Sequence, residues 1–183
     1  AHRMSQFEFI FVPISIIAGL ALTKLLSGMA RPPRNSSGQL DIAHIAFSAA
    51  TLVLLISVWW STFRWQKYEN WTVAEFFLLC GYVSLFYVLA TILSSSRTAD
   101  SPEFEEIRTK FYAVHAFYCV LEPVVIYVRD GELSPWYYVP MMIHFFVLSI
   151  LGIYLRMNMF DRLFSLWLLI VNVVWIFLAR FFG

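Results

Sequence analysis

The sequence predicts an all-α fold, a polytopic transmembrane bundle of about six helices, and three observations support this prediction. Hydrophobic residues make up 60% of the 183-residue chain and charged residues only 14%, which leaves more apolar surface than a soluble domain of this length can bury. Aromatic residues make up 19% and include seven Trp, as is typical of proteins anchored at both membrane–water interfaces. The apolar residues also fall into stretches of roughly 20, the length that crosses a bilayer. We therefore expect the lipid bilayer to cover the surface that the chain cannot bury.

The first half of the chain contains three such stretches. The first covers 7–29 and stops before 31–38, a run of charges, prolines and glycine that cannot continue a helix. The second covers 42–63 and the third 72–93. Only a short polar and aromatic connection separates these two, which predicts a tight helical hairpin.

The second half begins with the longest polar segment, residues 94–110. It carries Glu103, Glu105 and Glu106, and we expect a solvated loop or a short amphipathic turn there. Short polar connections then separate three further apolar stretches. The expected helices of this half cover residues 111–128, 135–155 and 160–182. Nothing in the sequence resembles a separate soluble domain, so we predict one integral membrane domain, 1–183.

The distribution of Lys and Arg predicts an orientation in the membrane, whereas the net charge indicates no charged partner. The formal net charge of +1 offers no footprint for nucleic acid, so we expect no nucleic-acid partner. Of the 13 Lys and Arg residues, eight lie on the side of the loops after the first, third and fifth helices: Lys24, Arg31, Arg34, Arg97, Arg108, Lys110, Arg156 and Arg162. The other side holds five: Arg3, Arg64, Lys67, Arg129 and Arg180. Because cytoplasmic loops carry the excess, we expect both termini to face outward.

One intramembrane residue stands out, Glu122 in the fourth expected helix, because an ionisable group within the hydrocarbon needs a functional or structural reason. His115, Cys119 and Glu122 are four and three residues apart, so they share one face of that helix, which should point inward. At ~1.5 Å per residue, Glu122, His144 and Asn172 all lie roughly 16 to 18 Å deep on the last three helices. This equal depth allows one polar layer near the midplane.

Three interpretations of these residues stay open. In the first, Glu122 with His144 and Asn172 is a proton- or ion-binding site of a channel or transporter. In the second, the same residues are hydrogen-bonding glue between helices. In the third, His44, His115 or His144 holds haem, a metal or another cofactor. The sequence contains no H-x-x-x-H or C-x-x-C motif of known metal chemistry, so we expect no metal ligand and no cofactor.

Small side chains follow one face of the first expected helix. Ser15, Gly19, Thr23 and Ser27 recur every four residues, a spacing that lets another backbone come close. The stripe predicts a packing surface, whose partner is either a helix of the same chain or a helix of another copy.

The sequence shows no serine-hydrolase elbow, phosphate-cradling glycine loop or carboxylate pair placed for acid–base chemistry, so an enzyme is not indicated. We expect a structural or interaction role instead, as an oligomer-forming protein or an accessory subunit of a membrane complex, with lipid bound in its aromatic grooves. The alternative is the channel or transporter centred on Glu122.

Three segments carry a resemblance to a known group of proteins. They are the opening FEFI at 7–10, GLALTKLLSG at 19–28 and the pair Trp59-Trp60. Together they resemble a group of small bacterial inner-membrane proteins with no assigned function. The resemblance implies a location in a bacterial inner (plasma) membrane, and it implies no activity and no site residue.

Overall fold

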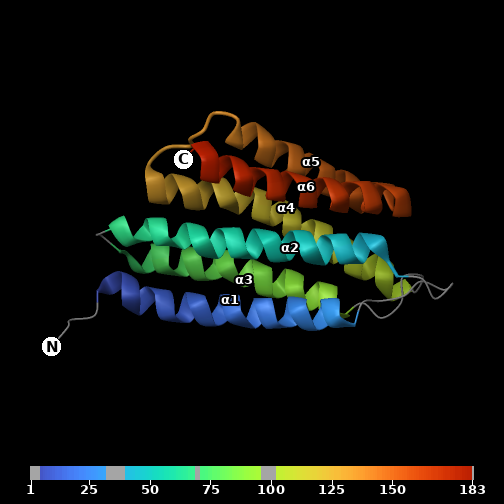
Figure 1. Cartoon of the computed structure of the whole chain (residues 1–183), viewed down its shortest axis with the longest axis horizontal. Coiled ribbons are helices and arrows are strands. Elements are labelled where there is room, and N and C mark those ends of the chain that lie inside the picture. The colour runs from blue at the N-terminus through green and yellow to red at the C-terminus, as the bar shows by residue number, and fades with distance from the viewer. Residues whose placement is uncertain (1–4, 32–39, 69–70, 96–101, 183) are drawn as a thin grey trace.

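Six long helices run side by side in the part of the chain that the structure describes (Figure 1). The computed structural model describes residues 5–31, 40–68, 71–95 and 102–182, apart from the side chains of 102–106 and 179–182. The helices are α1 (Gln6–Ala30), α2 (Ile42–Ser61), α3 (Val73–Ser95), α4 (Pro102–Asp130), α5 (Tyr138–Leu155) and α6 (Asn158–Phe182). A short 3-10 helix, η1 (Thr62–Lys67), extends α2. The predicted all-α class is confirmed.

Five of the six expected helices begin and end within three residues of their predicted bounds. The fourth does not, because α4 begins at Pro102 rather than at residue 111. The expected solvated loop is therefore wrong for 102–110, whereas 96–101 lie outside the described residues. Proline suits the first turn of a helix, and the acidic residues Glu103, Glu105 and Glu106 suit the positive end of the helix dipole. The polar composition of this segment thus starts a helix instead of preventing one.

Side-chain caps fix where three of the helices begin. The Ser5 Oγ accepts a hydrogen bond from the Glu8 amide at 3.2 Å, and the Ser5 amide donates to the Glu8 carboxylate at 2.7 Å. Thr72 and Glu75 make the same reciprocal pair at the start of α3. Asp41 accepts from two amides at the start of α2. These caps satisfy backbone donors that the first turn leaves without partners.

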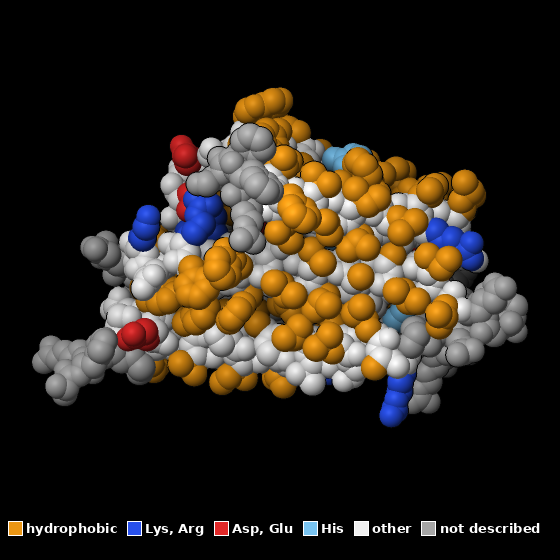
Figure 2. Space-filling view, in the orientation of Figure 1, with side chains coloured by type: hydrophobic (Ala, Val, Ile, Leu, Met, Phe, Trp, Pro, Cys, Tyr) orange, Lys and Arg blue, Asp and Glu red, His pale blue; other side chains and the backbone are white. Residues whose placement is uncertain are grey.

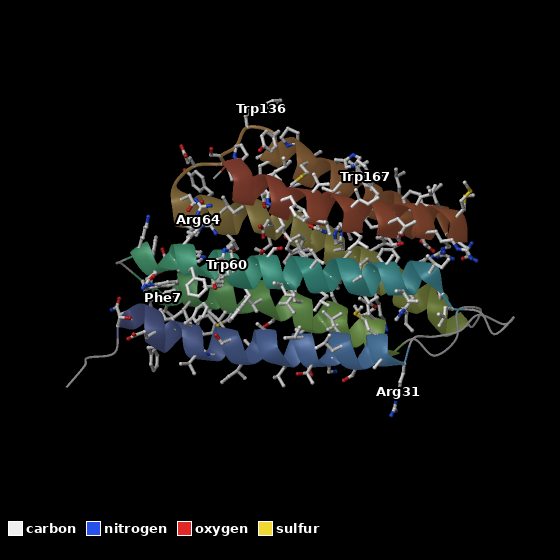
Figure 3. All side chains as sticks on the ribbon, in the orientation of Figure 1. Phe7, Arg31, Trp60, Arg64, Trp136 and Trp167 are labelled. Atoms are coloured by element: carbon white, nitrogen blue, oxygen red, sulfur yellow. The ribbon has the colours of Figure 1, made fainter. Side chains whose placement is uncertain are left out.

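The helices form two connected groups. Helix α1 packs along α3, α3 along α4, and α4 along α5, while α2 packs chiefly against α6 and also touches α1 and α3. We call the end of the bundle where α1 begins and α6 ends the Arg129 end, and the opposite end the Arg108 end (Figure 1). Arg31 projects from the Arg108 end, and Arg64 lies at the Arg129 end (Figure 3).

The outer surface of the bundle is apolar between its two ends. Hydrophobic side chains cover the middle of the visible face, whereas the basic and acidic side chains that it shows lie mainly toward the ends (Figure 2). Within the described residues, six helices are long and apolar enough to cross a membrane. A surface of this kind is stable in lipid and not in water. The chain is an α-helical integral membrane protein.

Candidate functional site

A cavity of about 520 Å³ lies between α2, α4, α5 and α6, in the half of the bundle next to the Arg129 end. Its wall is largely aromatic and aliphatic, with a small number of polar groups. Polar lining residues include His115, Cys119, Glu122, Asn172, Arg64 and Arg129. A concave, mostly apolar space with few convergent polar groups is the usual form of a small-molecule site.

One face of α4 supplies most of this polar lining. His115, Cys119, Glu122, Ile126 and Arg129 follow one another at spacings of four, three, four and three residues, so they lie in a row along the helix. Pro123 comes directly after Glu122 and has no N–H to give to the carbonyl of the preceding turn. The face that the sequence predicted to point inward is the face that lines the cavity.

The Glu122 carboxylate is surrounded by tyrosines. Tyr82 of α3 donates its hydroxyl hydrogen bond to Glu122, and the hydroxyls of Tyr118 and Tyr138 lie near the same carboxyl group. The Tyr138 side chain is 5% exposed, and its hydroxyl makes no well-formed hydrogen bond to the described residues. Glu122 therefore sits among neutral hydroxyl donors.

The two cations that line the cavity share one acidic partner, Asp130. Arg129 donates from Nε and Nη2 to the two carboxylate oxygens of Asp130, both at 2.8 Å. Arg64 Nη2 lies 3.1 Å from the same carboxylate, although its side chain is 64% exposed. Among the described residues, no Lys, Arg or His forms an ion pair with Glu122. The buried carboxyl group thus makes no direct ion pair in this part of the chain, and Arg129 acts on it only from beyond contact distance.

His115 and Cys119 form the inner boundary of the cavity. The Ser149 hydroxyl donates to the Phe145 carbonyl at 2.8 Å, so its oxygen accepts from His115 Nδ1, also at 2.8 Å. Cys119 Sγ lies 3.8 Å from the same nitrogen. In a neutral imidazole this leaves the Nε2 lone pair as the remaining polar group of His115.

Toward the Arg108 end the interior is filled by packed side chains. The ring centroids of Phe47 and Phe111 are 4.4 Å apart, and those of Tyr112 and Phe164 are 5.4 Å apart. Further along, Arg108 Nη1 donates to Asp161 at 3.0 Å, and Tyr112 donates to the other Asp161 oxygen at 2.7 Å. The Arg108 and Asp161 side chains are only 5% and 3% exposed. Aromatic packing and an ion pair therefore close this half of the bundle.

The structure brings together four of the five polar residues singled out from the sequence. Glu122, His115, Cys119 and Asn172 all line the cavity, where the Asn172 amide donates to the Leu168 carbonyl at 2.9 Å. His144 does not join them. Its ring is on the outside of the bundle, where Nε2 accepts a hydrogen bond from Trp167 at 3.1 Å. The expected place of His144 in the midplane layer is wrong, because equal depth does not fix which way a helix is rotated.

Sequence analysis missed the tyrosines and Arg129 as parts of the site. Tyr118 carried a usable signal, because it lies four residues before Glu122 and hence on the same face of α4. Tyr82 and Tyr138 gave none, because they belong to helices whose rotation only packing decides.

The small-residue stripe of α1 faces outward. Ser15 is half-buried, and Gly19, Thr23 and Ser27 are exposed, while α1 uses an adjacent face against the other helices. A Cβ added at Gly19 would meet nothing within 4 Å. Within the described residues, no helix of the same chain covers the exposed part of the stripe.

Comparisons with known proteins found no relative of this chain. No family model, no curated protein and no solved structure matches it. The resemblance to small bacterial inner-membrane proteins therefore stays a prediction. Within the described residues there is also no group of three or more His, Cys, Asp or Glu side chains placed to hold a metal ion.

Proposed function

We propose that the protein is a membrane transport protein that couples a proton or another cation to the occupancy of the cavity beside Glu122. The observation that carries this proposal is a buried carboxyl group that faces a cavity and has no ion-pair partner among the described residues. An ionised carboxylate in an apolar interior costs several kcal/mol unless another charge compensates it. Glu122 therefore needs either a proton or a bound cation, and the two exclude each other.

The asymmetry of the bundle supports the same proposal. The cavity occupies the half next to the Arg129 end, whereas aromatic rings and the Arg108–Asp161 pair fill the other half. Alternating access requires a site that is open to one side of the membrane at a time. An outward location of both termini, as the distribution of Lys and Arg favours, belongs to this proposal and would place the cavity on the outer side of an inner membrane.

A flux assay in proteoliposomes tests the role of Glu122. We expect Glu122→Gln to lose at least about tenfold of the cation-dependent proton flux, because the amide cannot exchange a proton for a cation. His144→Ala is the matched control, since it removes a polar residue at similar depth outside the cavity and should leave the flux unchanged. Monodisperse elution and an unchanged melting temperature must show first that both variants fold. Equal flux in Glu122→Gln, or no flux of several cations in the wild type, would contradict transport.

Self-association through α1 is a second candidate function, favoured by the exposure of the small-residue stripe. With no helix of the described chain over Gly19 and Thr23, these residues are able to receive a helix of another copy or of a partner in a membrane complex. We expect Gly19→Leu to lower crosslinking between copies in liposomes, with Leu20→Ala on the neighbouring exposed position as the control. A wild-type chain that stays monomeric at every protein-to-lipid ratio would contradict this role.

A further inference from the structure

We propose that the ligand of the cavity is an amphipathic organic cation, a quaternary or protonated amine with an apolar body. This inference deepens the proposed function and uses the same site. In it, the cationic head lies beside Glu122, and the apolar body lies against the aromatic wall toward the Arg129 end.

Charge selects a cation for this site. Glu122 is the single acidic residue among the described residues that line the cavity. Of the two basic lining residues, Arg129 is held by both oxygens of Asp130, and Arg64 contacts the same carboxylate. One carboxylate compensates only one of these two charges, and the remaining positive charge belongs to Arg64, whose side chain is 64% exposed. An anion would have to approach Glu122 and also compete with Asp130 for the arginines. A cation meets a carboxyl group that makes no direct ion pair with the described residues, and it displaces nothing but a proton.

The wall of the cavity suits an organic cation better than a bare ion. Tyr118, Tyr137, Tyr138, Phe145 and Trp175 all line it, and the Trp175 ring lies 5.8 Å from Tyr137 and 6.0 Å from Tyr138. Ring faces attract organic cations, and this attraction grows when water is excluded. Tyr138 lines the same space with its ring, and its hydroxyl is buried near Glu122.

Size and ligand number argue against a metal ion. A cavity of about 520 Å³ is in the range of sites for small organic molecules and far larger than a dehydrated metal ion needs. Calcium and magnesium require about six oxygen ligands, whereas one carboxylate and a few hydroxyls converge here. The space left around Glu122 is apolar and aromatic, which is what the body of an amphipathic amine requires.

Binding of tetraphenylphosphonium tests the inference on the purified full-length chain. This cation has the shape of the anion tetraphenylborate, so the pair separates charge from size and apolarity. Equilibrium dialysis in detergent, corrected with a protein-free blank, should give saturable binding of tetraphenylphosphonium and none of tetraphenylborate. Binding should weaken at least about tenfold in Glu122→Gln and should weaken in the wild type as the pH is lowered, because a proton competes for the same carboxyl group.

Substitutions of Trp175 test the aromatic wall without changing charge. Trp175→Leu should weaken tetraphenylphosphonium binding several-fold, whereas Trp175→Phe should retain most of it, because a ring face remains for the cation. Absence of saturable binding to the wild type, equal binding of the borate, or full binding in a folded Glu122→Gln variant would overturn the inference.

The outcomes separate this inference from the proposed transport. Proton flux that depends on Glu122, with no saturable binding of tetraphenylphosphonium, would overturn the organic-cation ligand and leave transport standing. Saturable binding that depends on Glu122, with no flux in proteoliposomes, would overturn transport and leave the ligand class standing.

Discussion

Asp161 and Glu122 are both acidic residues inside the bundle, but the two halves of the molecule treat them differently. Asp161 accepts hydrogen bonds from Arg108 and Tyr112 in a region filled by aromatic rings. Glu122 accepts a hydrogen bond from the Tyr82 hydroxyl, lies near two further tyrosines and faces a cavity. A buried acidic residue is thus a candidate for function when no fixed partner compensates its charge, and a structural group when a fixed partner does.

Breaking the Arg108–Asp161 pair should have the largest effect. We expect Arg108→Met and Asp161→Asn each to lower the free energy of unfolding by about 3–5 kcal/mol, because each leaves one buried charge uncompensated. The double variant Arg108→Met/Asp161→Leu should recover most of this loss. Unfolding in mixed micelles, followed by tryptophan fluorescence, measures it, with exposed Arg31→Met as the control. Single variants within about 1 kcal/mol of the wild type would remove the structural role of the pair.

Cysteine accessibility compares the open and closed halves along one helix. Ser57 of α2 lines the cavity, whereas Ser48 of the same helix is 2% exposed in the closed half. In a background without Cys80 and Cys119, we expect Ser57→Cys to react with a small water-soluble thiol reagent roughly a hundredfold faster than Ser48→Cys, the ratio for an opening free energy of about 3 kcal/mol. Equal rates would mean that water reaches both halves alike. In intact cells, protection of Ser57→Cys from a membrane-impermeant reagent would contradict the outward cavity.

A glycine substitution should loosen the closed half. A Cβ at Gly152 of α5 would lie 2.5 Å from the ring of Tyr112, which Asp161 holds in place. We expect Gly152→Ala to lower the free energy of unfolding by about 1–3 kcal/mol, the usual cost of overpacking a well-filled core. Gly81→Ala is the matched control, because its Cβ would meet nothing within 4 Å. If both variants melt at the wild-type temperature, the packing between α4 and α5 accommodates an added methyl group, and this half of the bundle is not tightly filled.

His144→Ala should have the smallest effect. The ring lies outside both halves, with Trp167 as its hydrogen-bond partner on the neighbouring helix. We expect a change in the free energy of unfolding below about 0.5 kcal/mol, as for most surface positions. Asn172→Ala, at similar depth but inside the cavity, should alter tetraphenylphosphonium affinity, whereas His144→Ala should leave it unchanged. A loss of affinity in His144→Ala would show that the histidine communicates with the site.

Helix α4 shows what local sequence patterns can and cannot predict. Periodicity placed His115, Cys119 and Glu122 on one face, and that face lines the cavity. The polar composition of 94–110 predicts a loop and a helix that begins at residue 111, whereas α4 begins at Pro102. A polar first turn lies beyond the apolar stretch that signals a membrane span, so hydropathy alone cannot locate the start of the helix.

Length and apolar composition are properties of each segment alone, so they suffice to predict that this chain is all-α, that it crosses a membrane, and where most of its helices lie. Which side chains meet depends on how these segments pack against one another. His144 and Asn172 lie at similar depth to Glu122, yet His144 is on the outside of the bundle and Asn172 lines the cavity. The three tyrosines around Glu122 come from three different helices. Rotation and pairing of helices are set by packing between segments far apart in the chain, and no single segment encodes them.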